Sequence, residues 1–291
     1  MRKMFSDKHF FRNMNGIIVV NKEKGYTSRD VVNIVSKILG TKKIGHTGTL
    51  DPIAEGVLVL TVGKCTKLCD YLTSDDKEYI AEFVLSYETD TLDNTGNTLK
   101  TSDKVVSDEE IIKVINSFIG EYNQEVPKYS AVKINGKKLY EYARNSEDIS
   151  LPSRIVNIKN IEVISIGDVI KIKCLVSKGT YIRSLIRDIG LKLGTYATMT
   201  SLIRTRQGIF DINDSKTIDD IKNNNYKLIN VDELFEDFPK ININKEELKK
   251  ISNGCILNNS YNSEYVLFYY ESKLISIYKS VGNTIKPFIM F

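Results

Sequence analysis

The chain has 291 residues, 42% hydrophobic and 27% charged, which is the balance of a soluble globular protein with one large domain and a small one. No run approaches the roughly 18 apolar residues of a membrane span, and the basic N-terminus lacks the apolar centre of a signal peptide, so we expect a cytoplasmic protein without a membrane partner. The net charge of +4 permits a polyanionic partner without requiring one.

The first part of the chain alternates between short strands and helices. Hydrophobic periodicity predicts elements over 16–22 (buried strand), 27–40 (helix), 56–63 (strand), 65–72 (short helix) and 77–89 (long strand). A glycine turn at Gly25 separates the first two elements. Thr27 or Ser28 can cap the helix, and Gly40 ends it.

The middle of the chain continues this mixture without a strict strand–helix–strand rhythm. The pattern predicts a helix over 107–120 with a capping box from Ser107 to Glu110, and a turn followed by a helix over 133–144. Residues 154–194 predict two or three strands, a Lys-Gly turn and a helix from about Ile182. We therefore expect an α+β fold with a mixed sheet, not a doubly wound one.

Charge divides the last part of the chain. Residues 211–239 hold eight acids and three lysines, a net charge of −5, and are typical of a connecting segment. Residues 240–291 carry +3 and predict a helix, a turn at Asn253-Gly254 and short strands, so we expect a small β-rich appendage. Residues 1–210 carry the remaining +6.

Metal and phosphate-loop chemistry are both poorly supported. Cys65 and Cys69 lack a second pair, and the two other cysteines and the two histidines, His9 and His46, are scattered, so we expect buried thiols and no metal site. The stretch "GVLVLTVGKC" does not fit a phosphate loop, because six residues separate its glycines and Cys65 stands where a magnesium-binding hydroxyl is needed.

One carboxylate, Asp51 in "GHTGTLDPIAEG", has two interpretations. A turn aspartate that bonds nearby backbone amides is the common one. The alternative is an active carboxylate, because Pro52 restricts the backbone before it and small residues around it let a bulky ligand approach. Tyr79 also has two interpretations, as a core residue of a strand or as a functional residue. Arg183 is either a solvated helix residue or the partner of a buried carboxylate.

Five stretches together resemble the TruB family of bacterial tRNA pseudouridine synthases: "MNGIIVVNKEKGYTS", "GHTGTLDPIAEGVLVLTVGKCTK", "DKEYIAEFVLSYETDTLDNTG", "VPKYSAVKINGKKLYEYAR" and "SKGTYIRSLIRDIGLKLG". They cover about residues 14–206 in the family's order. Glu23 replaces the usual proline, and "LIR" at 202–204 replaces "LRR". The C-terminal part resembles the family's PUA-like RNA-binding domain only loosely.

The resemblance implies the pseudouridine synthase fold, a mixed and largely antiparallel central sheet with flanking helices. It divides the chain into an N-terminal extension (1–13), a catalytic core (14–210), the acidic segment continuing that core (211–239) and a small PUA-like domain (240–291). The implied reaction converts uridine at position 55 of the tRNA T-loop to pseudouridine, without cofactor or metal. The implied partner is the tRNA T-arm, and we expect a monomer with no obligate protein partner.

The resemblance also assigns roles. Asp51 is the nucleophile, Arg183 its counter-charge, and Asp90 the carboxylate that helps position Arg183. Tyr79 stacks on the flipped uracil and removes a proton late in the reaction. Tyr181 and Leu202 line the same pocket by resemblance, and His46 occupies the space in the T-loop that the flipped base vacates. Contacts to RNA phosphates are expected from four lysines, Lys22, Lys67, Lys137 and Lys138. The alternatives are a tRNA-binding folding chaperone without catalysis, and an RNA-guided synthase, which usually carries extra domains.

Overall fold

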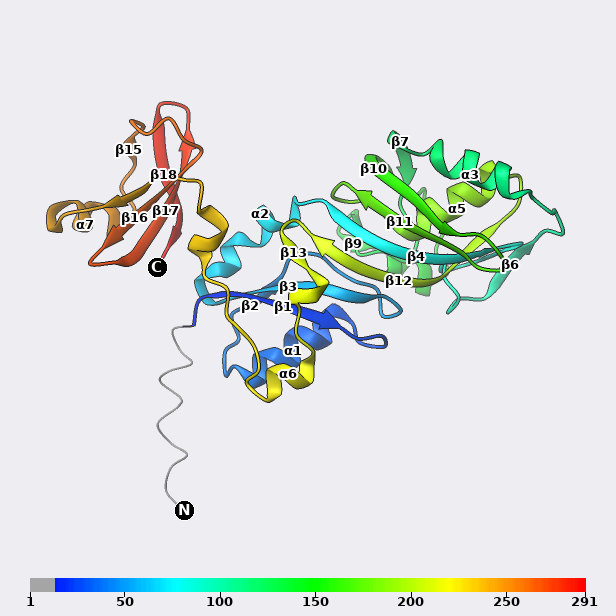
Figure 1. Cartoon of the computed structure of the whole chain (residues 1–291), viewed down its shortest axis with the longest axis horizontal. Helices are drawn as coiled ribbons and strands as arrows, with labels where there is room; N and C mark the ends of the chain where they lie inside the picture. Colours follow the sequence, from blue (N-terminus) through cyan, green and yellow to red (C-terminus); the bar gives the residue numbers. More distant parts are fainter. Residues whose placement is uncertain (1–13) are drawn as a thin grey trace, which may run out of the picture.

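The structure, a computed structural model, describes residues 14–291 (Figure 1). The predicted N-terminal extension over 1–13 lies outside these residues. None of the helices described is long and apolar enough to cross a membrane.

A nine-stranded sheet runs through the larger part of the molecule, in the order β1-β3-β12-β4-β11-β10-β7, with β2 paired to β3 and β13 to β12. Its strands are β1 (Gly16–Lys22), β2 (Ile44–His46), β3 (Glu55–Val62), β4 (Lys77–Leu85), β7 (Gly120–Glu125), β10 (Ser153–Ser165), β11 (Ile170–Val176), β12 (Ala197–Gln207) and β13 (Phe210–Asp211). The pair β3–β12 is parallel and the other pairs are antiparallel, which confirms the predicted mixed, largely antiparallel sheet.

Two features of this sheet differ from the prediction. The long strand predicted over 77–89 breaks at Ser86, whose φ of 88° is incompatible with a strand, so that β5 (Tyr87–Thr89) turns away to pair with β6 (Thr98–Thr101). The central strand β12 is not among the predicted elements. Its buried positions include Thr198, Arg204 and Gln207, and these polar residues hide the alternation expected of a strand.

Helices cover the sheet at both ends (Figure 1). The helices of this part are α1 (Ser28–Ile38), α2 (Cys69–Thr73), α3 (Asp108–Asn116), α4 (Leu139–Arg144), α5 (Ile182–Lys192) and α6 (Ile218–Lys222), with 3₁₀ turns η2 (Gly63–Leu68), η3 (Ile212–Asp214) and η4 (Val231–Phe235). Those that pack on the sheet are α1 and α6 near β1, and α3 and α5 near the opposite edge. A short hairpin, β8 (Lys133–Ile134) and β9 (Lys137–Lys138), precedes α4. Thr27, not Ser28, caps α1, and Ser107 caps α3 by accepting a bond from the Glu110 amide.

Strand β1 is apolar on both faces because it contributes to two cores. Ile18 and Val20 belong to the cluster that contains the buried face of α1. Ile17 and Val19 belong to a second cluster that includes Tyr265 of the C-terminal part. A continuous apolar run is therefore required here, as expected for a strand covered on both sides.

The last part of the chain forms the predicted β-rich domain. Its five strands, in the order β14-β16-β17-β18-β15, are β14 (Lys240–Asn242), β15 (Leu257–Asn258), β16 (Tyr265–Tyr270), β17 (Lys273–Val281) and β18 (Thr284–Met290), with helix α7 (Lys245–Ser252). Aromatic rings join this domain to α2: the centroid of Tyr71 lies 5.6 Å from that of Tyr265, and Phe235 of η4 lies 5.5 Å from Tyr71 and 5.2 Å from Tyr265. The domain is thus packed on the larger part through a shared aromatic cluster.

Gly56 allows β3 to approach β12. Its φ is +97°, and an added Cβ would overlap the carbonyl oxygen of Arg204. Gly56→Ala should therefore lower the free energy of unfolding by at least about 2 kcal/mol, measured by chemical denaturation. Gly282→Ala is the control, because Gly282 also has a positive φ but faces open space, so its loss should stay near about 1 kcal/mol. Equal losses would show that the contact with Arg204 costs nothing.

Candidate active site

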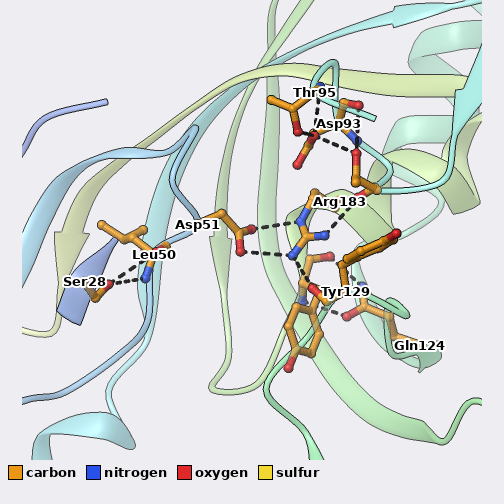
Figure 2. A network of polar contacts seen from close by, with 10 residues as sticks. Ser28, Leu50, Asp51, Asp93, Thr95, Gln124, Tyr129 and Arg183 are labelled. Atoms are coloured by element: carbon orange, nitrogen blue, oxygen red, sulfur yellow. Dashed lines mark hydrogen bonds and ion pairs between the residues drawn. The ribbon is translucent and has the colours of Figure 1, made fainter. Parts of the chain in front are cut away.

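The loop between β2 and β3 carries Asp51, and the β1–α1 turn holds it from both sides. The Leu50 amide donates to Ser28 Oγ at 2.9 Å, and Ser28 Oγ donates to the Leu50 carbonyl at 3.3 Å. The Gly25 amide donates to the Pro52 carbonyl at 2.8 Å. The backbone on either side of Asp51 is therefore fixed by a segment more than twenty residues away (Figure 2 shows the Ser28 side).

Lys22 in turn supports the β1–α1 turn. Its Nζ donates to the carbonyls of Glu23 at 3.0 Å and Tyr26 at 2.7 Å, and the residue is fully buried. Burial lowers the pKa of Lys22 to about 8, against the attraction of Glu55 and Asp51. We expected Lys22 at the RNA backbone, and the structure instead places its ammonium group inside the protein, where it can reach no phosphate.

Arg183, at the start of α5, holds the Asp51 carboxylate with two parallel bonds. Nε lies 2.8 Å from Oδ2 and Nη2 lies 3.0 Å from Oδ1 (Figure 2). The arginine side chain is 5% exposed and that of Asp51 is 34% exposed, so the cation is buried and the carboxylate remains open on one side. Such bidentate pairs combine charge with fixed geometry.

The same guanidinium also binds two backbone carbonyls, Thr91 O at 2.9 Å and Tyr129 O at 3.0 Å. The loop with Thr91 is ordered by Asp93, a 5% exposed residue whose Oδ1 accepts from Thr91 Oγ at 2.8 Å and from the Thr95 amide at 3.0 Å (Figure 2). Arg183 therefore depends on Asp93 through the loop backbone.

Asp90 lies in the same loop but does not contact Arg183. Its Oδ1 accepts from the Asn97 amide at 2.9 Å. We expected Asp90 to be the carboxylate behind Arg183, and the buried carboxylate at that place in the structure is Asp93. The sequence signal that distinguishes them is Asp-x-Thr, Asp93 to Thr95, which is the pattern of an aspartate-capped turn.

Tyr181 precedes α5 and is held by Gln124 of β7. The side chain of Gln124 is fully buried. Its Oε1 accepts from the Tyr181 backbone N–H at 2.8 Å, and its Nε2 donates to the Tyr181 carbonyl at 3.1 Å. The Arg154 guanidinium lies 5.5 Å from the centroid of the Tyr181 ring. These contacts fix the entry to α5, two residues before Arg183.

A cleft of about 300 Å³ opens beside this ion pair. Five of the predicted residues line it together: Asp51, Tyr79, Tyr181, Arg183 and Leu202. Several other lining residues were not predicted from the sequence, among them Lys77, Ser130, Lys178 and Arg204. Groups from β4, β12, α5 and three loops thus converge on one concave site, as expected of a ligand-binding site.

Arg204 and Tyr79 face each other across β12 and β4, where they are paired in register. Arg204 is 1% exposed, and its guanidinium donates to Val57 O at 2.6 Å and Gly48 O at 3.1 Å. Burial raises the pKa of Tyr79, and the positive charge of Arg204 opposes this shift. Lys77 is a further buried cation of the cleft, and burial lowers its pKa to about 8. The sequence carries no signal by which Arg204 could have been found, because its burial depends on tertiary contacts.

The other predicted residues lie outside the cleft lining. His46 ends β2, is half-buried, and has its pKa lowered by burial and by Arg29 and Arg204. Lys67 is exposed on η2. Lys137 forms an ion pair with Glu147, and Lys138 Nζ lies 3.2 Å from the Tyr140 hydroxyl. All four cysteines are free, and residues 14–291 contain no cluster of three potential metal ligands.

Family models match most of the chain. The "TruB family pseudouridylate synthase (N terminal domain)" model matches residues 36–182, and the "tRNA pseudouridylate synthase B C-terminal domain" model matches residues 183–236. Proteins named tRNA pseudouridine synthase B are similar along their length. That of Caldanaerobacter subterraneus is 40% identical over 92% of this chain and 93% of its own, and that of Staphylococcus aureus is 44% identical over 84% and 85%.

Solved structures share the fold. A chain from the structure of an H/ACA RNP bound to a substrate RNA containing 2′-deoxyuridine superposes with a TM-score of 0.69 and 24% identity, over 97% of this chain and 86% of the other. The similarity extends through the C-terminal β-rich domain, since nearly the whole chain is covered.

The buried ammonium of Lys22 makes stability depend on pH in a defined direction. Its pKa is about 8 in the folded protein and near 10.5 when unfolded, so between these values the unfolded state binds more protons and stability rises with pH. Relative to Lys22→Met, the wild-type free energy of unfolding should increase from pH 8 to pH 10, by at most about 1.4 kcal/mol per pH unit. Denaturation of both proteins at several pH values measures this. A difference that is constant with pH would show that Lys22 is not desolvated.

Proposed function

Since this chain belongs to the TruB family of tRNA pseudouridine synthases, we propose that it converts uridine 55 in the T-loop of tRNA to pseudouridine. The observation that carries the proposal is the half-open Asp51 carboxylate, held by a buried arginine at the mouth of a cleft. The relatives named tRNA pseudouridine synthase B support the class of reaction and the tRNA substrate.

The reaction moves a glycosidic bond without net oxidation or reduction. The bond between uracil N1 and ribose breaks, the uracil turns over within the cleft, and C5 bonds to the ribose as its proton leaves and N1 gains one. Asp51 supplies the nucleophilic oxygen, and the bond that this oxygen forms is broken again before the product leaves. Arg183 aims the carboxylate into the cleft, because its fork fixes both carboxylate oxygens.

The cleft must also hold a uracil that has left its stack. Tyr79 offers a buried aromatic face beside Asp51, and Leu202 and Tyr181 complete the apolar walls. Tyr79 would take the C5 proton as its phenolate; burial raises the pKa of Tyr79 and so favours the neutral phenol, and the positive charge of Arg204 opposes this effect. His46, on the neighbouring strand β2, would fill the space that the extruded base leaves in the T-loop.

Exposed cations and the C-terminal domain would bind the phosphates of the RNA backbone. Lys67 is exposed, and Lys178 lies at the cleft itself. The C-terminal domain carries a net charge of +3 and would add a contact to full-length tRNA. We propose that the protein acts as a monomer on the tRNA T-arm.

Asp51→Asn tests the proposed chemistry. The amide keeps the shape but provides no nucleophile, so turnover should fall by more than about three orders of magnitude with tRNA binding retained. Release of tritium from C5-labelled uridine in unmodified tRNA, followed by mapping of the pseudouridine, gives both rate and position. Wild-type product at another position would overturn the assignment to uridine 55. Wild-type binding without product would favour a folding chaperone.

Arg183→Lys tests the geometry of the ion pair. Lysine keeps the charge but loses the fork and the bonds to Thr91 and Tyr129. We expect the single-turnover rate to fall about 10- to 100-fold while the tRNA Kd changes less than about twofold, because Arg183 acts inside the cleft. Arg187→Lys, one turn along α5, is the control and should change neither. A normal rate for Arg183→Lys would contradict a role for the bidentate contact.

A further inference from the structure

Ser130 lines the cleft, and its buried hydroxyl has no partner within residues 14–291. The residue is 6% exposed. It lines the same cleft as Asp51 and Arg183. An unpaired buried hydroxyl is destabilising, so its presence at a binding site calls for a ligand that completes the bond.

The backbone around Ser130 is fixed, which leaves the hydroxyl as the unsatisfied group. The Ser130 amide donates to Lys128 O at 3.1 Å, and the Tyr140 amide donates to Ser130 O at 3.1 Å. The preceding carbonyl, that of Tyr129, accepts from Arg183 Nη2 at 3.0 Å. Ser130 is thus held at a set distance from the arginine that binds Asp51.

The other buried serines near the site are satisfied. Ser28 Oγ exchanges bonds with Leu50, and Ser184 Oγ donates to Glu125 O at 2.8 Å. Buried hydroxyls without a partner also occur at Thr195, Thr200 and Ser276, but none of these lines the cleft. The combination of an unpaired buried hydroxyl and a position in the cleft wall therefore distinguishes Ser130 within the described residues.

We infer that Ser130 Oγ hydrogen-bonds the uridine nucleotide that enters the cleft. The inference rests on the proposed function, since it takes the occupant to be an extruded nucleotide. A uridine nucleotide presents carbonyl oxygens, an imide N–H and ribose hydroxyls, and a serine hydroxyl both donates and accepts, so it can bond any of them. Ser130 is then a substrate-binding residue whose own hydrogen bond forms only in the complex.

This role predicts opposite effects on stability and on substrate affinity. Ser130→Ala removes a buried hydroxyl that has no partner in the free protein, so its melting temperature should equal or exceed that of the wild type. The same change removes a bond to the nucleotide in both the bound and the reacting states. KM for unmodified tRNA should therefore rise about 5- to 20-fold, with kcat within about twofold of the wild type.

Ser276→Ala is the matched control, because Ser276 has the same unpaired buried hydroxyl but belongs to β17 of the C-terminal domain. It should match Ser130→Ala in melting temperature and the wild type in KM. An unchanged KM for Ser130→Ala would overturn the inference. So would a raised KM accompanied by a melting temperature several degrees lower, since that is the result of a structural hydroxyl. A wild-type protein that forms no pseudouridine would overturn the proposed function itself, and the inference with it.

Discussion

The ion pair between Arg183 and Asp51 is the interaction on which the rest of the site depends. A buried guanidinium is stable only when its donors are satisfied, and Arg183 achieves this with one carboxylate and two backbone carbonyls. The three acceptors come from loops that are far apart in sequence, so a single side chain fixes the relative positions of all three. Because the Asp51 side chain stays one-third exposed, the pair is rigid on the protein side and open on the cleft side.

A layer of buried polar groups supports this pair. Ser28 and the Gly25 amide hold the residues next to Asp51, Gln124 holds the residue before α5, and Asp93 holds the loop behind the guanidinium. Gln207 extends the layer, since its Nε2 donates to Thr47 Oγ at 2.6 Å and to Leu72 O at 3.0 Å. Leu72 belongs to α2, whose Tyr71 packs against the C-terminal domain. The loop that carries Asp51 and the C-terminal domain are thus linked through α2, and removal of the domain would expose the aromatic side chains that pack against it.

The sequence predicted most of the apolar elements and five of the residues that line the cleft, but not the buried polar layer that supports them. Continuous apolar runs make β1 and β3 visible in the sequence, and periodic apolar positions do the same for α1 and α5. The family resemblance placed five separate motif residues in one pocket, where the structure brings them together. The buried polar residues of this layer are of types that usually lie at the surface, and only tertiary contacts show that they are buried; they include Lys22, Asp93, Arg204 and Gln207. Strand β12 was missed because its buried polar residues look like surface residues. Asp90 was chosen over Asp93 because the sequence does not show which of the two loop carboxylates is buried.

If Arg183 holds Asp51 as the structure shows, the two residues are coupled in the free protein, before any RNA binds. A double-mutant cycle of unfolding free energies, with Arg183→Met, Asp51→Asn and the combined variant, measures this coupling. We expect a favourable coupling energy of at least about 1 kcal/mol, because the guanidinium is buried and bound by both carboxylate oxygens. Additive effects of the two substitutions would contradict it, since the pair would then be two independent residues that happen to lie close together.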